Sequence, residues 1–185
     1  MTPETVQILF IDIQPEIVAN SRTNPPERLT AAAVALARLG TLFDLPMHAS
    51  VVPAGTGKPR LVPELADALP TVTPLTRTTA PVFGDGPTKA AIAATGRHDL
   101  VVCGVVTEVA VLLAAFDGVL AGHEVHVPVD ACGGLSQRTE EAAFRRIESF
   151  DAATACVATL GAVLAQDLGT DLGRETMAIL QTVMR

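Results

Sequence analysis

Residues 99–110, DLVVCGVVTEVA, decide the fold of this chain. Residues 99–103 are mostly apolar, and a short apolar run of this length predicts a strand that is buried on both faces. Thr107 stands where a helix N-cap is expected, and residues 107–121 then predict a helix that ends at Gly122. A buried strand that passes through a tight turn into a helix is the repeating unit of parallel α/β sheets.

Outside this stretch, strand-like and helix-like segments alternate without an internal repeat, a charge block or a linker. Residues 6–11 form an apolar run that ends in Asp12, which predicts another buried strand. The motif Asn24-Pro25-Pro26-Glu27 predicts a helix start, with Asn24 as the N-cap and a proline at the first helical position. Further strands are expected at residues 46–52, 72–75, 124–129 and 153–158, and further helices at residues 61–69, 84–95, 138–149, 160–167 and 172–184.

The composition is that of one globular domain spanning residues 1–185. Of the 185 residues, 49% are hydrophobic and 18% are charged, so a sizeable core is available and no disordered tail is indicated. The net charge of −7 argues against nucleic acid or an anionic membrane surface as a partner. No run approaches the roughly 20 apolar residues of a membrane helix, and the N-terminus lacks the pattern of a signal peptide. We therefore expect a cytoplasmic protein.

Metal and nucleotide sites have no matching motif. The three cysteines, Cys103, Cys132 and Cys156, fit no metal-binding spacing and are best explained as small buried thiols in a reducing compartment. The segment Gly55-Thr56-Gly57-Lys58 lacks the spacing of a phosphate-binding loop. We therefore expect neither a metal ion nor a cofactor.

The alternation of strands and helices predicts an α/β fold, with a parallel sheet covered by helices on both faces. In such sheets, ligands bind at the carboxyl ends of the strands, where the winding direction reverses. This rule selects positions that directly follow predicted strands: Asp12, Arg77, residues 104–107 and Asp130. The helix start at Thr107 can also hold an anion or an oxyanion with its unpaired N–H groups. Taken singly, Asp12 is equally well explained as a turn or helix cap, and Arg77 and Gln14 as surface residues.

Together these motifs resemble the isochorismatase-like, or cysteine hydrolase, superfamily, most closely its YcaC-like branch. The resemblance covers nearly the whole chain. It implies a three-layer α/β/α sandwich with a Rossmann-like, six-stranded parallel sheet in the order 3-2-1-4-5-6. Asp12 and the turn before Thr107 would then meet where the first and fourth strands are neighbours. The matching segments are Arg77 and residues 9–14, 61–65, 93–97, 101–109, 122–125 and 129–133.

The resemblance also implies roles for individual residues. Asp12 and Arg77 match the family's catalytic acid and its basic residue, which is often a lysine. A cis peptide is implied at Val105–Val106, and the N–H groups of Val106 and Ala110 are implied as an oxyanion hole. The residues expected to contact the substrate are Gln14, Phe83, Val105 and Thr107.

The sequence departs from the family at position 110, where the nucleophilic cysteine is replaced by Ala110. A methyl group cannot attack a substrate. Cys103 lies inside a predicted strand and should not reach the same space. Cys132 follows the fifth strand, lies nearer the carboxyl edge of the sheet and is the better placed of the two as a substitute.

Three explanations remain open. In the first, a natural enzyme hydrolyses an amide-type or vinyl-ether bond of a small molecule without a covalent step. For a vinyl ether, Asp12 would be the general acid and would need a raised pKa, whereas the nearby cation of Arg77 lowers the pKa of a carboxyl group. In the second, Ala110 is an engineered replacement for cysteine in an amide hydrolase. In the third, the chain is a degenerate homologue that binds a small molecule or acts through assembly. The gene sequence at position 110 and a restored Ala110→Cys variant assayed on amides discriminate among them.

A homo-oligomer is expected because relatives commonly form multimers. The last predicted helix either covers the core or packs on another subunit. Its apolar residues are Met177, Ile179, Leu180, Val183 and Met184. The aromatic candidates near the predicted site are Phe10, Phe83 and Phe116, for which core packing is the default explanation.

Overall fold

The central strands of the sheet are those whose residues are buried on both faces. In the computed structural model, which describes residues 1–184, β1 (Val6–Ile11) and β4 (Asp99–Val105) are buried along their full length. They pair in parallel from Val6 opposite Asp99 to Ile11 opposite Gly104. Burial on both faces explains why both sequences are nearly continuous apolar runs rather than alternating ones.

The sheet has the order β3-β2-β1-β4-β5-β7, and all its pairings are parallel. The expected order 3-2-1-4-5-6 is therefore confirmed, with β7 as the sixth strand. A further two-residue strand, β6, pairs with the end of β4 and was not predicted. The remaining strands are β2 (Met47–Val51), β3 (Leu75–Thr76), β5 (Glu124–Pro128), β6 (Cys132–Gly133) and β7 (Ala153–Ala155).

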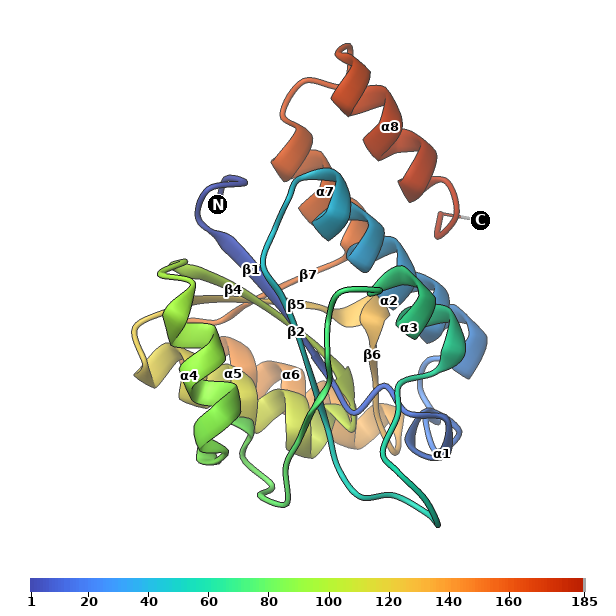
Figure 1. Cartoon of the computed structure of the whole chain (residues 1–185), viewed down its shortest axis with the longest axis vertical. Coiled ribbons are helices and arrows are strands. Elements are labelled where there is room, and N and C mark those ends of the chain that lie inside the picture. Colours follow the sequence, from blue (N-terminus) through green and yellow to red (C-terminus); the bar gives the residue numbers. More distant parts are fainter. Residues whose placement is uncertain (185) are drawn as a thin grey trace.

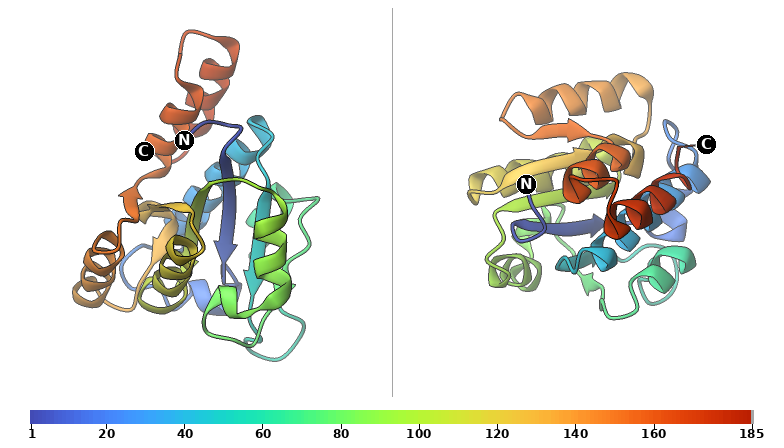
Figure 2. Two further views of the ribbon diagram at one scale, coloured as in Figure 1. Left: turned by 90° about the vertical axis from the view of Figure 1, so that its left-hand side faces the viewer. Right: turned by 90° about the horizontal axis from the view of Figure 1, so that it is seen from above.

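Helices cover both faces of the sheet and form the expected three layers (Figures 1 and 2). One face carries α4 (Gly86–Ala94), α5 (Leu112–Leu120) and α6 (Gln137–Glu148). The other carries α2 (Pro26–Leu42) and α7 (Val157–Ala165), while α3 (Pro63–Ala68) packs on α2. The last helix, α8 (Asp171–Leu180), packs against α7 and α2, and the short α1 (Pro15–Val18) follows β1.

The amphipathic face predicted for α2 is the face that enters the core. Leu29, Ala33 and Leu36 on this helix are at most 1% exposed. At the chain end, Leu180 of α8 is buried and Met177 is partly buried against the same core, whereas Met184 is 62% exposed. The apolar side of α8 thus covers the core, which is one of the two alternatives expected from the sequence.

Two predicted helix starts differ from the structure. Asn24 is not the N-cap of α2, because Pro25 holds that position. The Asn24 side chain instead donates to the carbonyl oxygens of Asp130 (2.6 Å) and Cys132 (3.3 Å). The polar side chain that could cap α2 therefore binds a distant segment instead.

The second difference is the helix that follows β4. Val106 is its N-cap, and the Thr107 hydroxyl donates to Glu140 Oε1 at 2.7 Å. The expected single helix is a wide π-helical turn, η2 (Thr107–Val111), which leads into α5. No helix within residues 1–184 is both long and apolar enough to cross a lipid bilayer.

Candidate active site at the carboxyl edge of the sheet

Asp12 follows directly on β1 and is fixed by the neighbouring strand. Its N–H donates to the carbonyl oxygen of Ser50 at 2.9 Å, and its backbone has a φ of 55°. Aspartate is one of the few residues other than glycine that adopts this left-handed conformation readily. The turn directs the chain away from the sheet, and the residue is left 5% exposed.

Arg77 follows β3 and reaches back to Asp12 across the end of β2. Its Nη1 and Nη2 atoms donate to the two carboxylate oxygens of Asp12 at 2.7 and 2.6 Å. Nη1 also donates to Ser50 Oγ at 3.1 Å, and Nε donates to the carbonyl oxygen of Thr79 at 3.1 Å. Arg77 is only 2% exposed, so this is a buried, bidentate ion pair.

Two opposing effects act on the Asp12 carboxyl. Burial raises its pKa more than the hydrogen bonds and charge of Arg77 lower it, so the pKa of Asp12 lies above its usual value. The guanidinium stays protonated at any ordinary pH. A carboxylate that accepts two parallel N–H groups from a guanidinium is in its ionised form, since a protonated oxygen cannot accept in that geometry. The pair therefore presents a fixed carboxylate rather than a free acid.

A close approach of two strands places the turn after β4 beside Asp12. Ile11 is opposite Gly104 in the register, so Asp12 and Val105 are the next residues along. Gly104 has a φ of 145°, and a Cβ atom there would stand 1.9 Å from the carbonyl oxygen of Ile11. Only glycine allows this contact. The expected cis peptide at Val105–Val106 is present.

Ala110 lies in the first turn of η2 and contributes a buried methyl group. The residue is 4% exposed. Its N–H donates to the carbonyl oxygen of Val106 at 2.9 Å, and Val109 N–H donates to the same oxygen at 3.1 Å. The amide expected at an oxyanion hole is thus engaged inside the turn.

The four residues predicted to contact the substrate do not all lie at the turn after β4. Val105 (1% exposed) and Thr107 (fully buried) belong to the turn itself. Gln14 Nε2 donates to the carbonyl oxygen of Val52, and Val52 N–H donates to Gln14 Oε1, so this amide side chain ties the segment after β1 to the end of β2. Phe83 lies elsewhere, against α5, where its ring tip is 3.9 Å from the position of a Cβ on Gly118.

Sequence reasoning missed the acids and the hydroxyl that surround the turn. Ser50, at the end of β2, is buried and bonds Arg77. Glu140 of α6 accepts from Thr107, and Glu108 Oε1 accepts from Leu135 N–H at 2.9 Å and from Thr139 Oγ1 at 2.6 Å. The other oxygen of Glu108 is buried and has no hydrogen-bond partner in the described part of the chain. Only Ser50, as a polar residue within an apolar strand, carried a detectable signal.

One group of three potential metal ligands lies at the opposite end of β4. Ligand atoms of His98, Asp99 and Glu124 come within 4.8 Å of one another. Asp99 is already engaged by the Thr5 hydroxyl and by the N-terminal ammonium group of Met1. Since exposed acidic groups often gather without an ion, we assign no metal to this group.

The family of the chain follows from comparison with known proteins. A family model described as "Isochorismatase domain" matches residues 6–160. The chain belongs to the isochorismatase family. The curated "Probable hydrolase YcaC" of Escherichia coli (strain K12) is 30% identical over 142 residues, which are 76% of this chain and 68% of that protein. The resemblance to the YcaC-like branch is thereby confirmed.

Two solved structures share the whole architecture of this isochorismatase-family member. YcaC from Pseudomonas aeruginosa, determined with hexane-2,5-diol and covalent acrylamide, superposes with a TM-score of 0.92 at 26% identity, over 100% of this chain and 91% of that one. YcaC from Escherichia coli, described as an octameric hydrolase of unknown specificity, gives a TM-score of 0.88 at 27% identity, over 100% and 88%. These relatives support an isochorismatase-family hydrolase of unknown specificity.

Proposed function

We propose that this chain hydrolyses an amide-type bond of a small molecule with water, rather than a thiol, as the nucleophile. The observation that carries the proposal is the carboxylate of Asp12, which Arg77 fixes beside a turn whose position 110 bears only a methyl group. In this proposal a water molecule takes the place that the sulfur of a cysteine at position 110 would occupy beyond this methyl.

Asp12 acts as the general base in this proposal. Each of its oxygens accepts one N–H group from Arg77, and a carboxylate oxygen has a further lone pair with which to take a proton from water. The water oxygen then bonds to the amide carbon, and the proton held by Asp12 passes to the leaving amine as the C–N bond breaks. Burial raises the pKa of Asp12, which makes the carboxylate a stronger base than an exposed aspartate. Arg77 orients the carboxylate and cannot itself transfer a proton at neutral pH.

The same ion pair favours amide-type over vinyl-ether substrates. Protonation of a vinyl ether needs a carboxylic acid, and the bidentate contact with Arg77 stabilises the carboxylate instead. For the oxyanion we assign the main donor role to the N–H group of Val106. The Ala110 N–H contributes as a shared donor, since it also binds the carbonyl oxygen of Val106.

The test is an assay on a panel of small primary amides with matched esters and enol ethers. We expect slow turnover of at least one amide by the wild type, and a loss of at least about 100-fold in Asp12→Asn, the size typical for removing a general base. Ala110→Cys should gain a faster covalent route and form an adduct with acrylamide at position 110. Labelling of the wild type, which has the same three native cysteines, is the control for that adduct.

A second function is favoured by the enclosure of the site. Asp12, Arg77 and Ala110 are each at most 5% exposed, and surface cavities of about 400 and 920 Å³ are lined by other residues. A homologue that binds or assembles without turnover fits this enclosure. Failure of the wild type and of Ala110→Cys to hydrolyse any substrate in the panel would contradict the hydrolase proposal and support this second function.

We also propose that the chain forms a homo-oligomer, since the similar E. coli YcaC is an octamer. Light scattering on the whole protein tests this point. A monomer at micromolar concentration would contradict it.

A further inference from the structure

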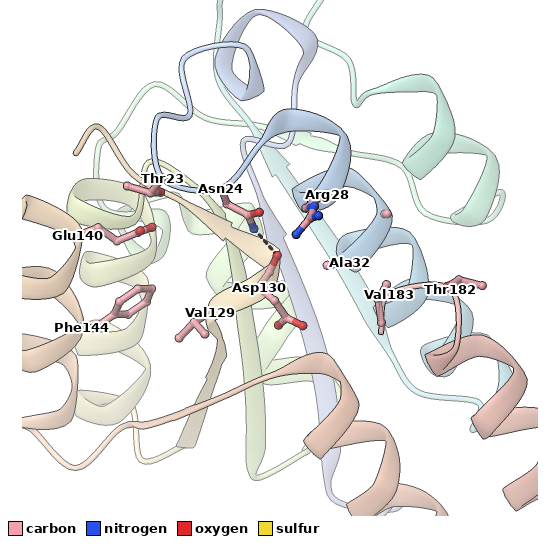
Figure 3. Close-up of a pocket in the computed structure, with 11 residues that line it drawn as sticks. Thr23, Asn24, Arg28, Ala32, Val129, Asp130, Glu140, Phe144, Thr182 and Val183 are labelled. Carbon is pink, nitrogen blue, oxygen red and sulfur yellow. Dashed lines mark hydrogen bonds between the residues drawn. The ribbon is translucent and has the colours of Figure 1, made fainter. Parts of the chain in front are cut away.

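A surface cavity of about 400 Å³ lies between α2, α6 and the segment after β5, away from the Asp12–Arg77 pair (Figure 3). This volume is within the range of small-molecule sites. The cavity has walls from four parts of the chain, which include the 3-10 turn η3 (Val129–Ala131) and the residues after α8. Its principal lining residues are Asn24, Arg28, Asp130, Glu140, Phe144 and Val183.

Charges of opposite sign face this cavity without pairing. Arg28 makes no ion pair with any residue in 1–184, and the Asp130 and Glu140 carboxylates have no cationic partner there either. Figure 3 shows the guanidinium of Arg28 and the carboxylate of Asp130 on different sides of the same space. The positive group and the negative groups are therefore both available to a ligand.

Helix stability does not explain the presence of Arg28. It is the third residue of α2, in the first turn, where the helix dipole disfavours a positive charge. Its side chain is exposed. An arginine at this unfavourable position, directed at a cavity, is the natural partner for an incoming carboxylate.

The acidic side is held in place by hydrogen bonds. The Asp130 carboxylate accepts the N–H group of Val157, at the start of α7, at 2.9 and 3.2 Å. Asn24 donates to the Asp130 carbonyl oxygen, and Glu140 Oε1 accepts from Thr107. Both carboxylates keep free lone pairs for an ammonium group. Their positions are set before any ligand binds, which lowers the entropic cost of binding.

An apolar wall completes the lining. The phenyl ring of Phe144 is partly buried, and Val129 is 37% exposed. Val183 and two alanines of α2 add further apolar surface. The ligand that matches this lining carries a carboxylate, an ammonium group and a small apolar body.

We propose that this cavity binds a free α-amino acid with an apolar side chain. The carboxylate of the ligand binds Arg28, its ammonium group binds the carboxylate of Asp130, and its side chain contacts Phe144. The cavity shares no residue with the Asp12–Arg77 pair, so this binding does not depend on the hydrolase proposal.

Isothermal titration of the whole protein with three probes tests the charge requirement. L-leucine carries both charges, 4-methylpentanoate carries only the carboxylate, and 3-methylbutylamine carries only the ammonium group. We expect L-leucine to bind at least tenfold more tightly than either analogue. Equal affinity for the amine and L-leucine, or no binding of L-leucine at millimolar concentration, would overturn the proposal.

Arg28→Gln locates the site, and Arg38→Gln is its matched control. Both arginines are exposed on α2, but Arg38 lines a different groove, next to α3. We expect Arg28→Gln to lose at least tenfold in affinity for L-leucine and Arg38→Gln to bind as the wild type does. Thermal melting without ligand checks that both variants fold. Unchanged binding in a folded Arg28→Gln would assign the L-leucine elsewhere and contradict the proposal.

Discussion

Asp12 and Asp130 each follow a strand of the same sheet, and each lies near an arginine. The two aspartate–arginine arrangements differ in whether the charged groups contact each other. Asp12 is 5% exposed and bonded through both oxygens to Arg77, whereas Asp130 is partly exposed and faces Arg28 across a cavity without contact. The first arrangement fixes geometry, because two buried charges must pair. The second leaves its charges to solvent or to a ligand. The same residue types at the same edge of the sheet are therefore bonded to each other or kept apart, according to burial.

The largest expected effect comes from breaking the buried pair on one side. Arg77→Met leaves the Asp12 carboxylate buried without its cation, and such an uncompensated charge typically costs about 3–5 kcal/mol. Chemical denaturation measures the loss in the free energy of unfolding. The double variant Arg77→Met/Asp12→Leu removes both charges and should regain most of that stability. A single variant as stable as the wild type would show that the pair is not desolvated.

The pH dependence of the same variant gives the next largest effect. In Arg77→Met only burial acts on Asp12, so its pKa in the folded state lies further above that in the unfolded chain. Between these two pKa values the folded state binds more protons, so the stability of the variant rises as the pH falls. The deficit relative to the wild type should shrink by about 1.4 kcal/mol for each unit by which the pKa is raised.

Unfolding measured from neutral to mildly acidic pH checks this expectation. The double variant without Asp12 serves as the control, because its stability relative to the wild type lacks this contribution. A deficit of Arg77→Met that stays constant across the series would contradict the assignment of the deficit to a buried carboxylate.

A smaller effect on stability is expected for substitutions of Asp130. Asp130→Ala removes the acceptor of Val157 N–H at the start of α7, and the loss of such a capping contact typically costs about 1 kcal/mol. Asp130→Asn keeps an oxygen acceptor and should retain most of the stability. Thermal unfolding of both variants measures the difference. Equal losses in the two would indicate that the charge, rather than the hydrogen bond, matters at this position.

The smallest effect on stability is expected for Arg28→Gln. An exposed side chain that forms no ion pair within the described part of the chain contributes little, so the free energy of unfolding should change by less than about 0.5 kcal/mol. Denaturant titration beside the wild type and Arg38→Gln is the measurement. A loss of stability comparable to that of Arg77→Met would contradict the distinction between a buried, paired Arg77 and an exposed Arg28 that contributes little to stability.

The architecture was predictable because its signals are local. Apolar runs set β1 and β4, Gly96 follows the end of α4 as expected, and α2 begins at Pro26, one residue after the start that the sequence predicted. The positions of Asp12 and Arg77 after their strands also followed from the strand pattern. The boundaries of short edge elements were not predictable from the strand pattern. The strand expected at residues 72–75 is β3 at Leu75–Thr76, because the extent of an edge strand depends on where it pairs with its neighbouring strand.

The site was only partly predictable, for a different reason. Thr107 and Asn24 carry the pattern of helix caps, but their side chains bind Glu140 and the segment after β5. Gln14 binds the backbone of Val52, and Phe83 packs on α5. In each case the side chain contacts a partner that is distant in sequence but close in space. A local sequence pattern cannot reveal which of the available partners the side chain contacts.

By itself, the sequence determined the order of strands and helices, the glycine at position 104 that lets β1 and β4 approach, and the absence of a thiol at position 110. These depend on residue type and on spacing along the chain. The tertiary structure alone decided that Asp12 is paired with Arg77, while Asp130 makes no ion pair with Arg28 or with any other residue in 1–184. The cost of an unpaired charge depends on burial, and burial exists only once the layers have packed.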